Sequence, residues 1–381
     1  PKTVEALKVQ QRTNPTAVTY TVAANHISAA VSELPEYISR ARDISGVGIT
    51  PPSIYKHDGS IKTGEIDGWT SLAYSDKQKV WNEETRFTNT DYFSNIQIDS
   101  LKNITYGEAT NYKGNSQDLK MDVYFPNTEL DTLKKRPFIL LIHGGGFTGG
   151  TRERMTYHSV ELSKRGFVVA TISYRLGYDV EIFGSIQKAV YRAQQDANTA
   201  LRYIASQKEI LKIDTEWFFI GGSSAGAVTS LSTSYASQAE WNQIAPQFES
   251  DLGPLESSNN SLNKIFTIKG IYNFMGAIPP VVFNSGNLIP TISFHGDLDT
   301  TVPIGKNIMT GFGSKPIHEL LSKAGVCNDL TVVPDGGHGI YRSKRDVDFR
   351  INRVACFFKS LICNRCVDFM AEESIPATCT N

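Results

Sequence analysis

A serine set among small residues follows an apolar run near the middle of the chain. Within WFFIGGSSAGAV (217–228), the segment Gly222-Ser223-Ser224-Ala225-Gly226 fits the pattern G-x-S-x-G, a tight turn between a buried strand and a helix. Small glycines let neighbouring backbone pass closely, and the strained central residue projects its hydroxyl outward. The pattern predicts Ser224 as a nucleophile. A Gly/Ser-rich turn without chemistry is the alternative.

A second glycine-rich segment could supply the electrostatic half of such chemistry. HGGGF (143–147) directly follows another apolar run. Acyl transfer needs backbone N–H groups aimed at the oxygen that becomes negative in the tetrahedral intermediate. We therefore expect Gly145 and Gly146 to be donors, together with the N–H of Ala225. His143 lies on the same side, where we expect it to brace the loop and not to act as a base.

A serine hydroxyl is a weak nucleophile at neutral pH and needs a base that a third group orients. In strand–turn–helix enzymes of this type, the order along the chain is serine, acid, histidine. Asp299 and His338 each follow a predicted strand, in HGDLDTTVP (295–303) and DGGHGI (335–340). The carboxyl ends of the strands are the edge at which open α/β sheets carry their sites. We predict Asp299 as the acid and His338 as the base.

Other titratable residues in these segments are weaker candidates for the acid and the base. Asp297 is the main competitor for the acid, whereas Asp335 lies too close to His338 along the chain. His295 opens the acid loop, and we expect it to help hold that loop. His318 falls within a helical pattern, which is typical of a surface or packing position.

Apolar runs and helical patterns alternate after about residue 102. This alternation predicts an α/β fold in which a mostly parallel sheet carries helices on both faces. The predicted strands are 104–112, 119–126, 137–145, 166–176, 217–222, 268–274, 290–296 and 330–336, and the predicted helices are 185–206, 225–236, 315–325 and 347–362.

The remaining segments predict the domain organisation. Residues 1–99 form an N-terminal extension, with a helical pattern at 26–44 and an extended loop at 45–69. Residues 100–381 form the catalytic domain. Within it, the polar and loop-like segment 237–264 is expected to be a cap insertion.

Composition excludes several classes of protein. The 381 residues carry a formal net charge of −1, which gives no electrostatic reason to expect nucleic acid or an anionic membrane surface as a partner. No apolar run is long enough to span a bilayer, and the first residues lack the apolar core of a signal peptide. A mature, processed secreted chain would begin in the same way.

All five cysteines lie in the last fifth of the chain: Cys327, Cys356, Cys363, Cys366 and Cys379. The spacing offers no fourfold zinc ligand set, and the Cys-x-x-Cys pair follows a helical pattern, unlike a redox motif. We expect one or two disulfides with one thiol left over, and hence a secreted or periplasmic protein. Ordinary buried cysteines of a cytosolic enzyme are the alternative.

The order of these motifs resembles the α/β-hydrolase superfamily and, within it, the carboxylesterase and hormone-sensitive-lipase-like esterases. The matching segments span residues 102–362: HGGGF (143–147), SYRL (173–176), QQDANTALRYI (194–204), GGSSAGA (221–227), HGDLDTTVP (295–303) and GGHG (336–339). The resemblance implies a Ser–His–Asp serine hydrolase that needs neither metal nor organic cofactor. Two departures leave the subfamily open: Ser223 stands where the lipase-like pattern has Asp, and position 297 is Asp.

The substrate is less well defined by the sequence. The pocket candidates, for each of which a core position is an equal alternative, are Phe147, Tyr178, Trp241, Phe274 and Met275. A polar cap favours short acyl chains or aromatic acids, on a small or polymer-linked ester. The resemblance implies acetyl or feruloyl groups of plant polysaccharides as an option. A serine peptidase of the same fold and a non-catalytic binding protein are the alternatives, and the oligomeric state is open.

Two sequons, Asn103-Ile-Thr105 and Asn259-Asn260-Ser261, become relevant in a glycosylating host.

Overall fold

The computed structural model describes residues 85–179, 181–182, 184–283, 286, 288–308, 310–340, 343–366, 368–373 and 379. The predicted helix at 26–44 and the predicted loop at 45–69 lie outside these residues, as does most of the expected N-terminal extension.

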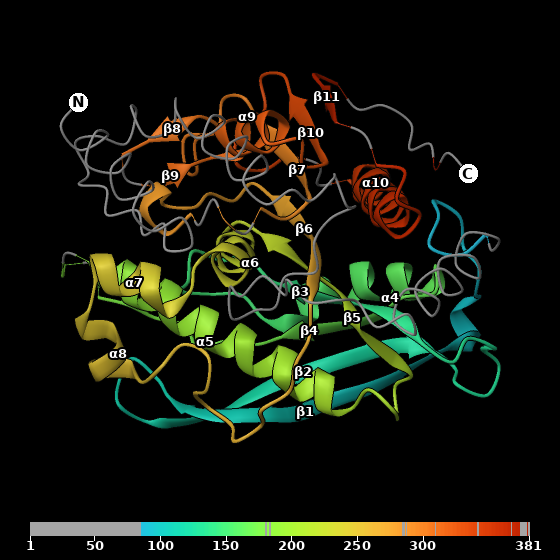
Figure 1. Ribbon diagram of the computed structural model, residues 1–381, viewed down its shortest axis with the longest axis horizontal. Coiled ribbons are helices and arrows are strands. Elements are labelled where there is room, and N and C mark those ends of the chain that lie inside the picture. Colours follow the sequence, from blue (N-terminus) through green and yellow to red (C-terminus); the bar gives the residue numbers. More distant parts are fainter. Residues whose placement is uncertain are drawn as a thin grey trace, which may run out of the picture.

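A mostly parallel sheet forms the centre of the described residues (Figure 1), with nine strands in the order β1-β2-β4-β3-β5-β6-β7-β10-β11. The first two pairings in this order, β1 with β2 and β2 with β4, are antiparallel, and all the others are parallel. The strands are β1 (Ile98–Thr110), β2 (Ser116–Pro126), β3 (Arg136–Ile142), β4 (Val168–Ile172), β5 (Ile213–Ser223), β6 (Ile268–Phe274), β7 (Thr291–Gly296), β10 (Asn328–Val333) and β11 (Phe369–Ala371).

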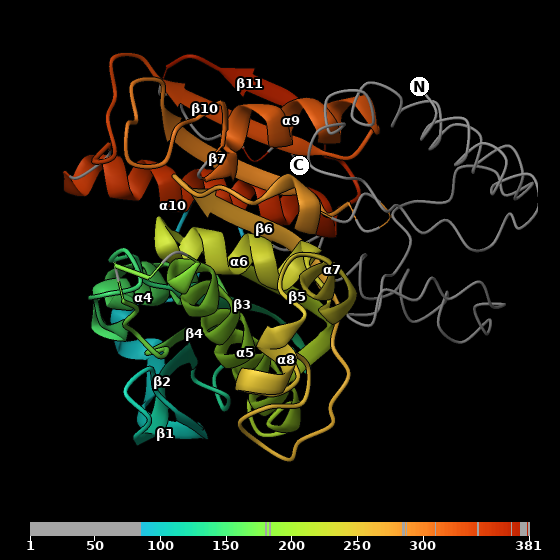
Figure 2. The ribbon, with the colours of Figure 1, turned by 90° about the vertical axis from the view of Figure 1, so that its left-hand side faces the viewer.

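Helices cover both faces of this sheet, as Figure 2 shows from the side. One core cluster joins the strands to α5 (Ser185–Ser206), α6 (Ala225–Tyr235) and α9 (Ser314–Lys323). A second cluster joins them to α4 (Thr156–Lys164) and α10 (Lys344–Ile362). Because helices lie on both sides, every residue of β3 and β4 is buried. The predicted α/β class, the continuous apolar strands and the principal helices are confirmed.

Short elements complete the described fold. They are η2 (Asn95–Gln97), η3 (Arg152–Met155), α7 (Gln238–Ile244), α8 (Gln247–Leu252), η4 (Pro280–Val282), β8 (Lys306–Asn307) and β9 (Gly311–Phe312).

The expected domain boundary at residue 99 falls inside β1, which begins at Ile98. Residues just before this strand already pack on the sheet's helices. Phe87 is fully buried, and its N–H donates to the carbonyl of Arg165 at 2.7 Å. The guanidinium of Arg86 forms a buried ion pair with Asp131. The packed fold of sheet and helices therefore includes residues from at least 85 onward.

The sequence predicts a loop-like segment at residues 237–264, but the structure has two helices there, α7 and α8. The loop prediction is therefore wrong. Trp241 of α7 is 1% exposed, and its indole N–H donates to Gln194 of α5 at 2.8 Å. Further along, the side chain of Asn259 donates to the buried carboxylate of Asp196 at 2.9 Å. These contacts fasten the segment to α5. Its role as a cap over the site stays a prediction.

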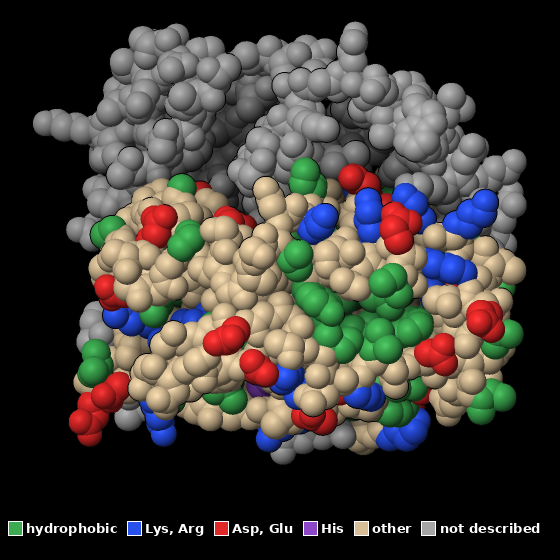
Figure 3. Space-filling view, turned by 90° about the horizontal axis from the view of Figure 1, so that it is seen from below, with side chains coloured by type: hydrophobic (Ala, Val, Ile, Leu, Met, Phe, Trp, Pro, Cys, Tyr) green, Lys and Arg blue, Asp and Glu red, His purple; other side chains and the backbone are tan. Residues whose placement is uncertain are grey.

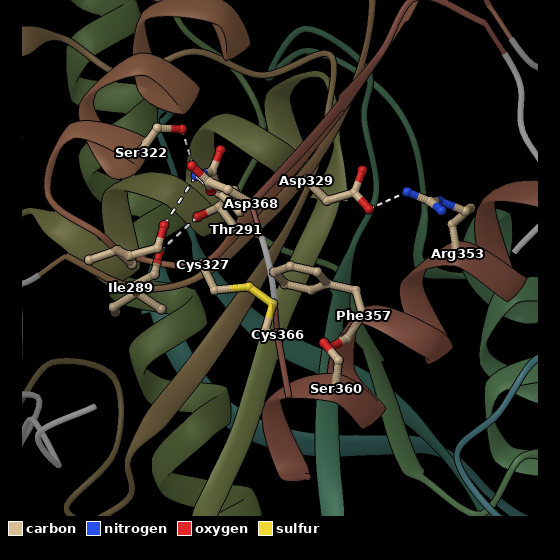
Figure 4. Close-up of a disulfide and its surroundings, with 12 residues drawn as sticks. Ile289, Thr291, Ser322, Cys327, Asp329, Arg353, Phe357, Ser360, Cys366 and Asp368 are labelled. Carbon is tan, nitrogen blue, oxygen red and sulfur yellow. Dashed lines mark hydrogen bonds and ion pairs between the residues drawn. A yellow bond between two sulfur atoms is a disulfide. The ribbon is translucent and has the colours of Figure 1, made fainter. Parts of the chain in front are cut away.

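The C-terminal part is cross-linked by two disulfides, Cys327–Cys366 and Cys356–Cys379, and Cys363 is free. The prediction of one or two disulfides with one thiol left over is therefore confirmed. In Figure 4 the first disulfide lies beside Phe357, close to the start of β10. It ties the chain after α10 to the residue that precedes β10.

The surface carries charges of both signs. On the face seen in Figure 3, acidic and basic side chains are interspersed around a patch of apolar ones, so this face presents no continuous basic surface. In the described part of the chain, no helix combines the length and the apolarity that crossing a bilayer requires.

Candidate active site

Ser224 is the single residue between β5, which ends at Ser223, and α6, which begins at Ala225. Its backbone angles are φ 54° and ψ −120°, a strained conformation for a residue with a side chain. The turn is held because the N–H of Ser224 donates to the carbonyl of Phe274 at 2.8 Å. A Cβ at Gly222 or Gly226 would lie 2.5 Å or 2.1 Å from the carbonyl oxygen of Ile142. Only glycine fits at these two positions.

The structure brings together the three residues predicted as nucleophile, base and acid. Oγ of Ser224 lies 2.8 Å from Nε2 of His338. Nδ1 of the same imidazole lies 2.7 Å from Oδ2 of Asp299. Since a carboxylate only accepts hydrogen bonds, the proton of the neutral ring is on Nδ1, and Nε2 can accept the serine proton.

Asp299 is an ionised acceptor in this arrangement. Its Oδ1 accepts hydrogen bonds from the N–H groups of Thr301 and Val302, each at 2.9 Å. Burial alone would raise the pKa of Asp299, but hydrogen bonds from His295, His338 and Val302 outweigh it and lower the pKa to about 2. The carboxylate thus stays charged at neutral pH and fixes the orientation of the imidazole.

The residues that the sequence offered as weaker candidates for the acid and the base differ from Asp299 and His338 in burial or position. Asp297 and Asp335 are exposed, whereas Asp299 is buried. His318 lies within α9, as expected of a packing or surface position. Of the two aspartates in the acid loop, Asp299 is therefore the one that meets His338.

The glycine-rich loop lies directly against the serine turn. A Cβ at Gly144 would lie 2.7 Å from the carbonyl oxygen of Ser223 and 3.2 Å from Cβ of Ser224. Gly145 and Gly146 have φ values of 132° and 62°, which glycine adopts without strain. In the described part of the chain, the N–H groups of Gly145, Gly146 and Ala225 have no hydrogen-bond acceptor. These three amides are the predicted donors to a substrate oxygen.

His143 braces this loop from inside. Its ring is fully buried and stacked on Tyr174 with ring centroids 4.5 Å apart. Its Nδ1 donates to the carbonyl of Gly144 at 2.8 Å. Burial lowers the pKa of His143, so the ring is neutral and has no contact with Ser224 that would let it act as a base.

The five pocket candidates have different surroundings. Trp241 packs against the rings of Tyr191 and Phe248. The ring of Phe274 lies beneath Arg350, whose guanidinium carbon is 3.7 Å from the ring centroid. These contacts give the two side chains a structural role, and their pocket role stays a prediction. The remaining three, of which Phe147 and Met275 are buried and Tyr178 is half-buried, stay candidates.

Two polar residues near the acid were missed by the sequence interpretation. Asn273 at the end of β6 and Ser314 at the start of α9 are fully buried and hydrogen-bonded to each other at 3.0 Å. Neither belongs to a recognisable motif, and the only signal was a polar residue within the apolar run 268–274. No group of His, Cys, Asp or Glu side chains that could hold a metal ion is found in the residues that the structure describes.

The strand order and the serine turn between β5 and α6 define the α/β-hydrolase class of folds. Within this class the chain is similar to the BD-FAE family, an esterase family of the α/β-hydrolase type whose model matches residues 121–279. The match includes the glycine-rich loop and the serine turn, and it ends before Asp299 and His338.

Curated relatives match only locally. The methylphloroacetophenone synthase of Cladonia uncialis is 43% identical over 67 residues, which are 17% of this chain and 3% of that protein. The neuroligin-like protein glit-1 of Caenorhabditis elegans is 28% identical over 112 residues, which are 29% of this chain and 15% of that protein. The chain thus spans a small part of the length of these relatives.

Solved structures with a similar course of the chain include an esterase from Thermogutta terrifontis, with 18% identity, a TM-score of 0.49, and coverage of 71% of this chain and 94% of that chain. A truncated carbohydrate esterase from gut microbiota has 18% identity, a TM-score of 0.49, and coverage of 71% and 98%. Identities this low do not carry a substrate from one protein to another.

Proposed function

We propose that the chain hydrolyses carboxylic esters through Ser224, His338 and Asp299. The observation that carries the proposal is the pair of hydrogen bonds at 2.8 Å and 2.7 Å that join the three side chains in line. Oγ of Ser224 attacks the ester carbonyl while Nε2 of His338 accepts the serine proton. The imidazolium then donates this proton to the oxygen of the leaving alcohol, and an acyl-enzyme remains.

Water completes the reaction by the same route. Nε2 of His338 accepts a proton from the water that attacks the acyl group, and the ring returns it to Oγ of Ser224 as the acid product leaves. Asp299 stabilises the charged ring at each step. The N–H groups of Gly145, Gly146 and Ala225 donate to the negative oxygen of both tetrahedral intermediates. Ala225 is the first residue of α6, where the helix dipole also favours negative charge.

For the substrate we propose esters of short or aromatic acids, with acetyl or feruloyl groups on plant polysaccharides as the polymer-linked case. The polar composition of residues 237–264 supports this choice, because a lid for long acyl chains would be more apolar. We also propose a secreted or periplasmic location, which the two disulfides support.

A ladder of p-nitrophenyl esters from acetate to palmitate, with methyl ferulate alongside, tests the function. We expect the highest kcat/KM on the short esters or on methyl ferulate, and a loss of at least about a thousandfold in Ser224→Ala. Ser223→Ala is the matched control, since the hydrogen bond to Nε2 of His338 comes from Ser224 and not from this neighbouring serine. A maximum at palmitate would overturn the substrate proposal, and full activity in Ser224→Ala would overturn the mechanism.

The same assay separates the alternatives. A wild-type protein that cleaves peptide p-nitroanilides much faster than any ester would be a serine peptidase. A folded protein that is inert on both would be a binding protein on the hydrolase fold.

A further inference from the structure

A line of buried polar side chains continues from the acid into the interior. Nε2 of His295 lies 3.3 Å from Oδ2 of Asp299 and 2.7 Å from the carbonyl oxygen of Val302. Nδ1 of the same ring lies 2.7 Å from Oγ of Ser314, which in turn lies 3.0 Å from Nδ2 of Asn273. His295, Ser314 and Asn273 are all 0% exposed. Polar groups buried this deeply are expected to be tied into a defined network.

The donor and acceptor of each bond in this line are fixed by the backbone at its two ends. Oδ1 of Asn273 accepts from the N–H of Gly276 at 2.9 Å, so the amide nitrogen of Asn273 faces Ser314. At the other end, the carbonyl of Val302 can only accept, so Nε2 of His295 carries the proton. Nδ1 of His295 therefore accepts from the hydroxyl of Ser314. His295 is left with one N–H, which points at the acid loop.

The same turn also holds the nucleophile. Asn273 begins the turn 273–276, and the carbonyl of the next residue, Phe274, accepts from the N–H of Ser224 at 2.8 Å. Phe294 of β7 is paired with Phe274 in the sheet, and its carbonyl accepts a hydrogen bond from the N–H of Met275 at 3.0 Å. One short turn thus supports the backbone of Ser224 directly and the carboxylate of Asp299 through Ser314 and His295.

We propose that His295, oriented by Ser314 and Asn273, is a positioning residue that holds Asp299 in register with Ser224. Its Nε2–H bridges the carbonyl of Val302 and Oδ2 of Asp299, and so closes the acid loop over the carboxylate. The inference rests on the proposed function, since it assigns His295 a role only through Asp299. In the described residues, the hydrogen-bond and ion-pair partners of the His295 ring are Ser314, Val302 and Asp299.

A double-mutant cycle with Asp299→Asn tests the proposal, with p-nitrophenyl acetate as substrate. We expect His295→Leu to lower kcat about tenfold while KM changes less than twofold. In the Asp299→Asn background the same substitution should have no further effect, because there is no carboxylate left to position. His295→Gln keeps a side-chain N–H that can reach Val302, so it should recover most of the lost rate.

Equal losses in both backgrounds, or a wild-type kcat in His295→Leu, would overturn the proposal. Should His295→Leu fail to fold, Ser314→Ala replaces it in the cycle, with an expected loss of about threefold. Ser230→Ala is the matched control, because this buried hydroxyl donates within its own helix, to the carbonyl of Gly226 at 2.8 Å. Failure of the proposed function itself is recognised separately, since Ser224→Ala would then leave the rate unchanged.

Discussion

Nδ1 of His338 lies 2.7 Å from Oδ2 of Asp299, although 39 residues separate the two along the chain. We expect Asp299→Asn to lower kcat by about a thousandfold or more, because the amide no longer accepts the Nδ1 proton and the ring loses its orientation. Asp297→Asn is the control and should retain wild-type kcat, since that side chain is exposed. Steady-state kinetics on a p-nitrophenyl ester measures both. Equal losses in the two variants would contradict the choice of acid.

The glycine-rich loop permits a matched pair of alanine substitutions. Gly144→Ala places a Cβ 2.7 Å from the carbonyl oxygen of Ser223, so the loop or the serine turn must shift. We expect kcat to fall about tenfold or more, because the proposed oxyanion donors move with the loop. At Gly149 the nearest atom to an added Cβ lies 4.0 Å away, and Gly149→Ala should keep nearly full activity. A Gly144→Ala variant as active as Gly149→Ala would refute this close approach.

The raised pKa of Asp329 makes its contribution to the free energy of unfolding decrease as pH rises. Most carboxylates have a lowered pKa in the folded state and contribute in the opposite direction. Burial raises the pKa of Asp329 to about 6, although its ion pair with Arg353, shown in Figure 4, opposes the shift. Between about pH 4 and pH 6 the folded state therefore binds a proton that the unfolded chain has released. This group's contribution to the free energy of unfolding falls as pH rises across that window.

Urea unfolding at several pH values from 4 to 7 checks this sign. The difference in free energy of unfolding between wild type and Asp329→Asn should change across the window, in favour of wild type at the acidic end. Asp118→Asn, which changes a carboxylate that is 56% exposed, is measured alongside for comparison. A constant difference for Asp329→Asn would show that the carboxyl titrates normally.

The disulfides should account for a large share of the stability of the C-terminal part. They close loops with sequence separations of 39 and 23 residues, each worth roughly 3–4 kcal/mol by loop entropy. We expect the double substitutions Cys327→Ser/Cys366→Ser and Cys356→Ser/Cys379→Ser to lower the free energy of unfolding by up to these amounts. Cys363→Ser removes only the free thiol and should leave it nearly unchanged. A large effect of Cys363→Ser alone would point to a different pairing.

The two sequons differ in accessibility. Asn103 is exposed on β1, whereas Nδ2 of Asn259 donates to the buried carboxylate of Asp196. The glycan attaches to that amide nitrogen, so secretion from a glycosylating host should modify Asn103 and leave Asn259 bare. Intact mass before and after endoglycosidase, for Asn103→Gln and Asn259→Gln, measures this. A glycan that persists in Asn103→Gln would contradict the assignment.

The sequence by itself determined the principal elements and predicted which residues could react. The apolar runs around residues 137–145 and 217–222 predicted strands buried on both faces, and β3 and β5 lie there. The glycines around Ser224 predicted a tight strand-to-helix turn, and the structure has one. These features are local: periodicity and the small size of glycine act over a few neighbouring residues.

Only the tertiary structure decided which of these residues meet. Asp299 and Asp297 have the same chemistry and lie two positions apart, and burial beside His338 separates them. The pairing of the cysteines, the packing of Trp241 on α5 and the line from Asn273 to His295 likewise join elements that are distant in sequence. The physical reason is the strand order, which sets β5, β6, β7 and β10 side by side and so gathers the ends of segments more than a hundred residues apart.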